Sequence, residues 1–298
     1  MGLGTLLKRL FRRGRAADSG KGVVELAARL GMSAEALRTL RVDYREFRIP
    51  KRSGGSRVIH APDKDLKSVQ RRILRRLLAR LHSHAAATGF ERSSSIVHNA
   101  RCHAGAAVVV RLDIEGFFKS TGVERVREFF QTLGWNREAT GILTRTCTHK
   151  SGLPQGASTS PRLSNLINYK LDVRLAALAT SFPGTIYTRY ADDITFSIAT
   201  DDRATIRSLI AATRAIAREY GYRTHHRRKT RVRRRHQRQT VTGLVVNERA
   251  NLPRRVRRWL RSVEHHRRTG RRPSLTPSQL EGWRALEAMV RAQSTAPG

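Results

Sequence analysis

The sequence predicts an α+β fold, because stretches with helical spacing and stretches with strand character alternate along its 298 residues. Apolar residues recur at helical spacing over residues 66–81 and 203–220. The β-branched run at residues 108–110 indicates a buried strand, and two further strands are expected around a tight turn at residues 191–192. No apolar run is long enough to span a bilayer, so we expect no membrane-spanning segment.

The first half of the chain carries clear start and stop signals. Residues 23–40 predict two short helices, because Gly31 interrupts the helical pattern and Ser33 is a good N-cap. This pattern resembles a DNA-reading helix-turn-helix, although a small packing element is the alternative. A β-hairpin is expected next, with strands at residues 47–50 and 57–59 around a Gly54-Gly55 turn.

Helices dominate the rest of the predicted order. We expect helices over residues 123–133, 136–147 and 161–179. The Arg-rich tail is expected to be helical from Leu252, broken near Pro273 and Pro277, and helical again over residues 278–293. The sequence Val-Thr-Gly-Leu-Val-Val-Asn, which begins at Val241, predicts a short strand pair or a strand and turn.

The charge balance points to a polyanionic partner. The chain has 59 Lys and Arg residues against 23 Asp and Glu residues, a formal net charge of +36. A protein this basic repels itself unless a polyanion neutralises it, which favours nucleic acid. Its two cysteines are too few for a disulfide scaffold or a cysteine-only zinc site, and no signal peptide is evident, so we expect a cytoplasmic location.

Three aspartates stand where carboxylates are costly. Asp113 ends the apolar strand segment, and Asp192 and Asp193 lie together between two apolar stretches. Divalent cations would remove the cost of burying and crowding these charges, and carboxylates from neighbouring strands can hold two Mg²⁺ ions for phosphoryl transfer. The alternative is an Asp-Asp turn that caps neighbouring amides.

The motifs around these aspartates resemble those of reverse transcriptases. Tyr-Ala-Asp-Asp at 190–193 resembles the catalytic box of that family, residues 112–118 resemble its first aspartate motif, and residues 153–161 resemble its nucleotide-contacting loop. Two further boxes resemble the retron branch of the family: Asn-Ala-x-x-His at 99–103 and Val-Thr-Gly at 241–243. The resemblance covers roughly residues 40–260.

The resemblance implies a right-hand polymerase with fingers, a palm built on an antiparallel sheet, and a helical thumb. We expect an N-terminal helical extension at 1–45, fingers and palm at 46–250, and a basic thumb at 251–298. The implied cofactor is a pair of Mg²⁺ ions, with Mn²⁺ as a possible substitute. Their expected ligands are Asp113, Asp192 and Asp193, which are also the catalytic residues, with a contribution from the Ile114 carbonyl.

Two further groups of residues receive roles from the resemblance. The expected nucleotide-binding residues are Lys51, Arg57, Phe118, Gln155, Gly156 and Lys229. Among them Phe118 would select dNTPs by excluding a 2′-hydroxyl, whereas Phe117 is expected in the core. The expected RNA-contacting residues are Asn99, His103, Val241, Thr242, Gly243, Arg254, Arg257, Arg258 and Arg261.

The implied function is that of a retron RNA-directed DNA polymerase. Such an enzyme copies a cognate structured non-coding RNA into a branched RNA–DNA hybrid, primed from a guanosine 2′-hydroxyl, and commonly acts with an effector protein in anti-phage defence. The expected partners are that RNA, its hybrid product, dNTPs and an effector. Two alternatives are another prokaryotic reverse transcriptase, of the group II intron or diversity-generating type, and a non-catalytic helix-turn-helix regulator.

Overall fold

The computed structural model describes residues 20–50, 54–92, 94–225, 230–271 and 274–294. The chain divides into two compact units. Unit 1 comprises the chain up to Ser83 together with Gly116–Tyr169, and unit 2 comprises His84–Glu115 together with the chain from Lys170 onward. Each unit is therefore built from two separate stretches of sequence.

Unit 1 combines helices with one β-hairpin. Its elements are α2 (Val23–Leu30), α3 (Ala34–Arg38), β1 (Tyr44–Pro50), β2 (Ser56–Pro62), α4 (Lys64–Ile73), the π-helical turn η1 (Leu74–Leu78), α6 (Phe117–Ser120), α7 (Val123–Thr132), α8 (Arg137–Cys147) and α9 (Ser160–Ile167). The two strands pair antiparallel along their whole length, as the sequence predicted.

The predicted pair of short helices is confirmed as α2 and α3. Gly31 ends α2 in a left-handed conformation, and the side chain of Ser33 accepts a hydrogen bond from the backbone N–H of Ala36. Leu26, Leu30 and other apolar side chains of these helices are buried in the hydrophobic core of unit 1, with side chains from α4, α7, α8 and α9. The apolar faces of α2 and α3 therefore pack into the interior of unit 1.

Unit 2 contains a four-stranded antiparallel sheet, a short hairpin and five helices among its described residues. Its elements are α5 (Ile96–Arg101), β3 (Val108–Asp113), α10 (Tyr169–Thr180, beginning at the last residue of unit 1), β4 (Thr185–Tyr190), β5 (Asp193–Ile198), α11 (Arg203–Glu219), β6 (Arg231–Arg234), β7 (Thr240–Val241), β8 (Leu244–Val245), α12 (Arg254–Arg268) and α13 (Pro277–Ser294). The strand order is β4-β5-β3-β6. The predicted α+β class is confirmed.

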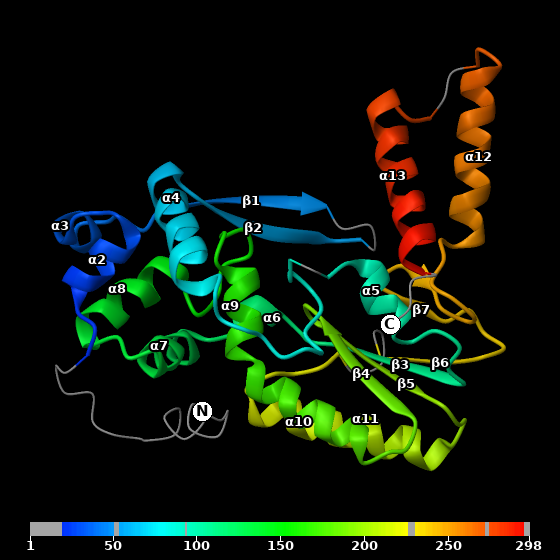
Figure 1. The fold of residues 1–298 in the computed structure, drawn as a ribbon, viewed down its shortest axis with the longest axis horizontal. Helices are drawn as coiled ribbons and strands as arrows, with labels where there is room; N and C mark the ends of the chain where they lie inside the picture. The colour runs from blue at the N-terminus through cyan, green and yellow to red at the C-terminus, as the bar shows by residue number, and fades with distance from the viewer. Residues whose placement is uncertain (1–19, 51–53, 93, 226–229, 272–273, 295–298) are drawn as a thin grey trace. The chain divides into compact units, whose positions relative to one another are not determined.

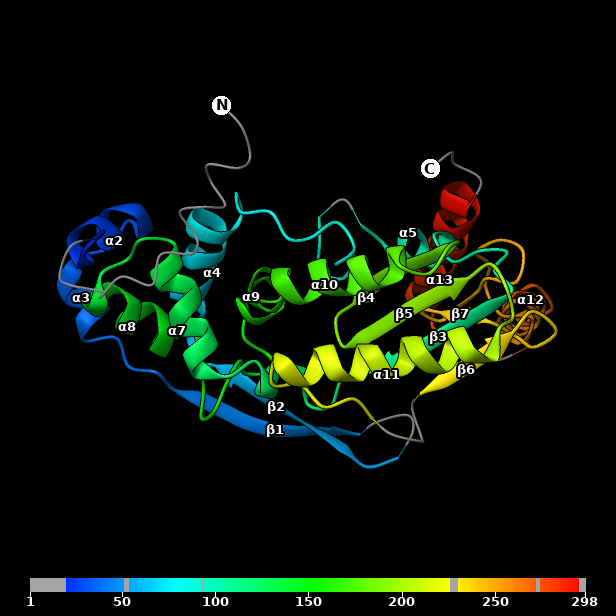
Figure 2. The same ribbon diagram turned by 90° about the horizontal axis from the view of Figure 1, so that it is seen from below.

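Strand alternation separates the two faces of this sheet. Val108, Val110 and Leu112 of β3 lie on one face and are fully buried, whereas Arg111 and Asp113 lie on the other face and are half-buried. Helices α10 and α11 lie side by side over the apolar face (Figure 2). The second face, which carries the polar residues of β3, holds the candidate site.

A buried ion pair joins α10 to the sheet. The guanidinium of Arg189 donates two hydrogen bonds to the carboxylate of Asp172, at 2.6 and 2.7 Å, and both side chains are completely buried. The hydroxyl of Tyr187 donates a third bond to Asp172, at 2.7 Å. The carboxylate therefore receives three donors, which is the condition under which a buried charge is tolerated.

The basic C-terminal segment folds into two helices. Helices α12 and α13 confirm the two helices predicted from Leu252 onward and over residues 278–293, and they run antiparallel to each other (Figure 1). The two helices, α5 and the β7–β8 hairpin share a hydrophobic core of unit 2, which includes Val97, Val241, Leu260 and Val290. Over the described residues, no helix has the length and apolar content of a membrane span.

One predicted helix is wrong. Residues 161–179 were expected to form a continuous helix, but α9 ends at Ile167 and α10 begins at Tyr169. Asn168 causes the break: its amide donates to the carbonyl of Ser164 and its carbonyl accepts from Arg125. These side-chain bonds stabilise a non-helical residue that the apolar spacing alone cannot reveal.

We predict that Asp172→Asn destabilises unit 2 by about 3–5 kcal/mol, because it leaves the buried guanidinium of Arg189 without its counter-charge. The matched control is Glu219→Gln, which removes a carboxylate from the exposed Arg174–Glu219 ion pair between α10 and α11 and should cost at most about 1 kcal/mol. Denaturant unfolding of both variants measures the difference, and equal losses would contradict the prediction.

Candidate functional site

The three predicted aspartates come together at the ends of two neighbouring strands of unit 2. Asp113 and Asp193 are direct cross-strand partners in the β3–β5 ladder, so their side chains share one face of the sheet. Asp192 lies in the turn between β4 and β5, and its carbonyl accepts a hydrogen bond of 2.9 Å from the backbone N–H of Ile114. Ala191 makes the tight turn possible with φ of 56°.

Two basic side chains, Arg111 and His225, contact the carboxylates of this cluster. The guanidinium of Arg111 donates to Asp193, with 2.6 Å between Nη2 and Oδ2. The ring of His225 lies between two carboxylates, with Nε2 3.2 Å from Asp113 Oδ1 and Nδ1 3.2 Å from Glu115 Oε1. Asp113 and Asp193 are therefore already engaged by side chains of the same unit.

The donor set of this cluster suits a hard divalent cation. Carboxylate and carbonyl oxygens are the ligands that Mg²⁺ prefers, and Asp113, Asp192 and Asp193 supply carboxylates from adjacent strand ends. The part of the chain that the structure describes contains no group of three His, Cys, Asp or Glu side chains already gathered at metal-binding distances. The residues thus fit the predicted cation chemically, provided that their carboxylates turn toward it.

The turn that carries Asp192 is contacted by a segment for which the sequence indicated a resemblance to retron enzymes but no structural role. A Cβ atom at Gly89 would lie only 2.8 Å from the backbone nitrogen of Ala191, so no other residue fits there without a shift of the turn. The ring of the next residue, Phe90, lies 6.3 Å from that of Tyr190, between centroids. Gly89 and Phe90 therefore define the position of the aspartate turn.

Three of the predicted nucleotide-binding residues lie on two adjacent segments of unit 1. Arg57 is exposed on β2, and the loop of Gln155 and Gly156 runs beside the same strand, where the Gln155 carbonyl accepts a 2.8 Å bond from the N–H of His60. Gly156 has φ of 127°, and a Cβ there would come within 2.6 Å of the His60 carbonyl. The loop can approach the strand because residue 156 is glycine.

The two phenylalanines after the first aspartate motif differ in burial. Phe117 is buried, as predicted, whereas Phe118 is half-buried and packs against the core of unit 1. Their ring centroids are 5.5 Å apart. Part of the Phe118 ring is thus accessible, as contact with a nucleotide sugar requires.

Two predicted nucleotide-binding residues, Lys51 and Lys229, lie outside the described residues. Of the predicted N-terminal extension, residues 1–19 also lie outside them.

The Asn-Ala-x-x-His and Val-Thr-Gly boxes are largely internal. Asn99, His103 and Val241 are at most 1% exposed, so the prediction that these side chains contact RNA directly is not supported. Asn99 accepts a hydrogen bond of 2.7 Å from the Thr88 hydroxyl. The boxes were chosen by motif, and a motif does not distinguish an RNA contact from a contact inside the protein.

His103 joins the first box to the polar face of the sheet. Its ring nitrogens lie 2.9 Å from the Ser197 hydroxyl of β5 and 2.7 Å from the Thr188 hydroxyl of β4. Burial lowers the pKa of His103 to about 3, and the nearby charge of Arg111 acts in the same direction. The ring is therefore neutral near pH 7, with one nitrogen donating and the other accepting.

The Val-Thr-Gly box forms the predicted tight turn between β7 and β8. Thr242 and Gly243 both have positive φ, 46° and 87°, as a two-residue hairpin turn of this kind needs. Val241 is in the core of unit 2, and the hydroxyl of Thr242 donates a 2.8 Å bond to the carbonyl of Ile96, at the start of α5. The second box thus contacts the helix that carries Asn99.

The predicted RNA-contacting arginines of α12 are all exposed. Arg254, Arg257, Arg258 and Arg261 extend from a helix whose apolar side, Leu260 and Val263, packs into the core. Exposed guanidinium groups on one rigid helix are suited to phosphate contacts. That role stays a prediction.

Sequence reasoning missed Arg111 and His225. Arg111 had a usable signal, since residues two apart on a strand share a face and Arg111 precedes Asp113 by two. His225 had none, because its approach to Asp113 depends on the path of the chain after α11. The backbone bond from the N–H of His225 to the carbonyl of Asp113, 2.9 Å, fixes that path in the fold.

Comparison with known proteins identifies the family of the chain. A family model described as reverse transcriptase (RNA-dependent DNA polymerase) matches residues 49–246. The chain is 37% identical to the retron Mx162 reverse transcriptase of Myxococcus xanthus over 92% of its own length and 64% of that protein. It is 36% identical to the retron Mx65 reverse transcriptase of the same organism, over 89% of the chain and 67% of the relative.

A third relative is matched over more of its length. The chain is 33% identical to the retron Ec86 reverse transcriptase of Escherichia coli, over 88% of the chain and 82% of the relative. The chain therefore belongs to the reverse transcriptase family, within which it is similar to retron enzymes. It spans only about two thirds of the two Myxococcus relatives.

We predict that His103 makes the stability of unit 2 depend on pH. Its pKa is lower in the folded chain, about 3, than the ordinary value of 6.5, so the unfolded chain takes up the proton first as the pH falls. The stabilisation is complete above about pH 6.5 and is lost toward pH 3, by up to about 1.4 kcal/mol per pH unit.

The measurement is the free energy of unfolding between about pH 7 and pH 5, for the wild type and His103→Gln. The variant should have the shallower dependence on pH, because the remaining histidines contribute alike to both proteins. Identical slopes would show that the ring is protonated or exposed in the folded chain.

Proposed function

We propose that the chain is an RNA-directed DNA polymerase of the retron type, with its catalytic centre at Asp113, Asp192 and Asp193. The observation that supports this most directly is the placement of these three aspartates at the neighbouring ends of β3 and β5, where Asp113 and Asp193 are cross-strand partners and Asp192 lies in the adjoining turn. The family match and the three retron relatives support the reaction class.

Asp113 and Asp192 would hold the cations of the reaction, with the carbonyl of Ile114 as a further oxygen ligand. When bound, a pair of Mg²⁺ ions, or Mn²⁺ in their place, lowers the pKa of the primer hydroxyl and stabilises the leaving pyrophosphate. Arg111 holds the carboxylate of Asp193 and His225 that of Asp113, so these side chains orient the acids before substrate arrives.

The residues of unit 1 would bind the incoming dNTP. Arg57 and Lys51 would contact the triphosphate from the β1–β2 hairpin and the turn that joins its strands, and Gln155 and Gly156 would contact the nucleotide from the adjacent loop. Phe118 would exclude a 2′-hydroxyl. We assign the hairpin to the fingers, the four-stranded sheet to the palm, and α12 with α13 to the thumb, within the predicted boundaries 46–250 and 251–298.

The substrate would be a structured non-coding RNA, copied from a guanosine 2′-hydroxyl into a branched RNA–DNA hybrid. We further propose an effector protein as partner, in anti-phage defence. The buried residues of the two boxes, Asn99, His103 and Val241, would serve this function by holding α5 and the β7–β8 hairpin against the sheet. The exposed arginines of α12 would supply the phosphate contacts.

We predict that Asp113→Asn or Asp192→Asn lowers DNA synthesis on a primed poly(rA) template by about 100-fold or more, because each change removes a cation ligand. RNA binding should be kept, since the basic helices are unchanged. Glu124→Gln on α7 is the control, because it removes the same charge from an exposed position of unit 1. Wild-type synthesis by either aspartate variant would reject the site.

We predict that Phe118→Val allows ribonucleotides to be incorporated. The smaller side chain leaves room for a 2′-hydroxyl, so the preference for dNTPs over rNTPs should fall by about 10- to 100-fold. Phe118→Tyr keeps the ring and should keep the preference. Single-nucleotide extension with matched dNTP and rNTP gives the ratio, and an unchanged ratio in the valine variant would assign Phe118 to the core alone.

A further inference from the structure

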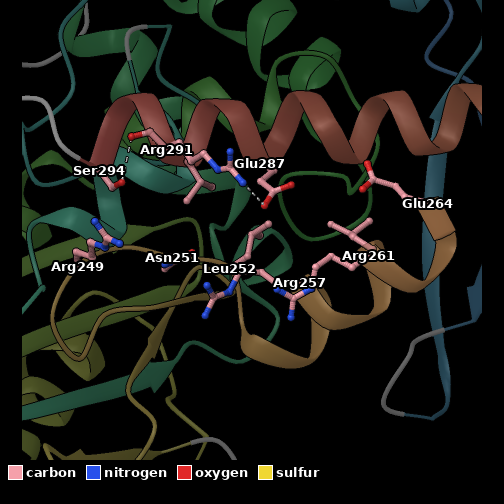
Figure 3. Close-up of a pocket in the computed structure, with 11 residues that line it drawn as sticks. Arg249, Asn251, Leu252, Arg257, Arg261, Glu264, Glu287, Arg291 and Ser294 are labelled. Atoms are coloured by element: carbon pink, nitrogen blue, oxygen red, sulfur yellow. Dashed lines mark hydrogen bonds and ion pairs between the residues drawn. The ribbon is translucent and has the colours of Figure 1, made fainter.

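Helices α12 and α13 enclose a cavity together with the segment at residues 249–252. Its volume is about 510 Å³, within the range of small-molecule sites (Figure 3). Figure 3 shows the labelled side chains of the two helices on its two sides, with Arg249, Asn251 and Leu252 at one end. We call it the α12–α13 pocket. It belongs entirely to unit 2 and contains none of the three aspartates.

Positive charge dominates the lining. Four arginines contribute to it, namely Arg249, Arg257, Arg261 and Arg291. The two acids of the lining have partners on α13, since Glu287 accepts from Arg291 at 3.1 Å and Glu264 accepts from Arg284 at 2.9 Å. Among the described residues, no hydrogen bond or ion pair engages the guanidinium groups of Arg249, Arg257 or Arg261. These three groups are available to an anion.

Three apolar side chains stand among the otherwise polar lining of the pocket. Leu252, Leu260 and Val290 line it and are at most 5% exposed. A free phosphate gains nothing from an apolar surface, whereas a nucleobase gains from burying its ring. The lining therefore suits a ligand that carries both a planar apolar part and a phosphate.

We propose that the α12–α13 pocket binds one unstacked nucleotide of single-stranded RNA, with its base against Leu252, Leu260 and Val290 and its flanking phosphates on the arginines. Proteins commonly read single-stranded RNA in this way, with a base turned out of the stack and guanidinium groups on the backbone. This proposal rests on the proposed function, because it takes the substrate RNA as the ligand.

The two acids favour RNA over an acidic protein segment. Glu264 and Glu287 would repel any anion close to them, whether carboxylate or phosphate, but a glutamate can also accept a hydrogen bond from an N–H group on the edge of a base, such as the N3–H of uracil. Asn251 and Ser294 add polar groups at the end of the pocket away from Glu264 (Figure 3). The pocket thus combines contacts for a base edge, a base face and a phosphate.

Two pairs of substitutions on α12 separate the pocket from the general charge of the helix. Arg257→Gln with Arg261→Gln removes two arginines of the lining, and Arg255→Gln with Arg258→Gln removes two exposed arginines that do not line it. Each pair removes the same charge from the same helix. Ser294→Trp is a third variant, which fills the pocket from its rim without a change of charge.

The probes are an oligouridine of about 12 nucleotides and an abasic ribose-phosphate chain of equal length. The full-length wild type should bind the oligouridine about 10-fold more tightly, because base contacts add to the phosphate contacts. The pocket pair should lower the ratio of the two affinities toward one. The control pair should weaken the binding of both probes alike and keep the ratio. Ser294→Trp should lower the ratio and leave the salt dependence of binding unchanged.

Three results would overturn the proposal. The first is that the ratio of oligouridine affinity to abasic-chain affinity is unchanged in both the pocket pair and Ser294→Trp. The second is that this ratio falls equally in the two arginine pairs. The third is that polyglutamate displaces oligouridine from the wild type and the control pair only. The last result would assign the pocket to an acidic protein segment. DNA synthesis on primed poly(rA), measured on the same preparations, tests the polymerase activity independently of the pocket.

Discussion

Electrostatic repulsion among carboxylates at two adjacent strand ends is the constraint around which unit 2 is arranged. Asp113 and Asp193 face each other across the β3–β5 ladder, and their charges need cations nearby. Arg111 reaches Asp193 from the same face of β3, and its guanidinium also donates to the carbonyl of Thr240 at the start of β7. One side chain thereby connects the acidic cluster to the hairpin of the Val-Thr-Gly box.

The two faces of the sheet differ in how they accommodate charged side chains. On the apolar face the charge of Asp172 is buried completely and receives bonds from Arg189 and Tyr187, which makes that face rigid and closed. On the polar face the aspartates stay partly accessible, and α5 is held there by neutral contacts of His103. The buried residues of the two boxes thus serve the site indirectly, because they hold α5 and the β7–β8 hairpin on the same face as the aspartates.

The sequence was most informative where a local pattern determines the outcome. The strands β3, β4 and β5 and the turn at Ala191 were predicted, because β-branched runs and an abrupt pair of acids are local signals. The break at Asn168 was not, because it depends on hydrogen bonds to Ser164 and Arg125 that periodicity does not encode. Similarly, motif resemblance found His103, but only the fold shows that the side chain is buried on the polar face of the sheet, in contact with β4 and β5.

The division of each unit into two stretches of sequence has a consequence during synthesis. The residues that form the core of unit 1 have all been made by the end of α9, so that core can close while the rest of the chain is still being translated. Strand β3 is made earlier but pairs with β5 and β6, which come much later. An apolar strand therefore waits unpaired on the ribosome, and this interval is when the nascent chain is most exposed to aggregation.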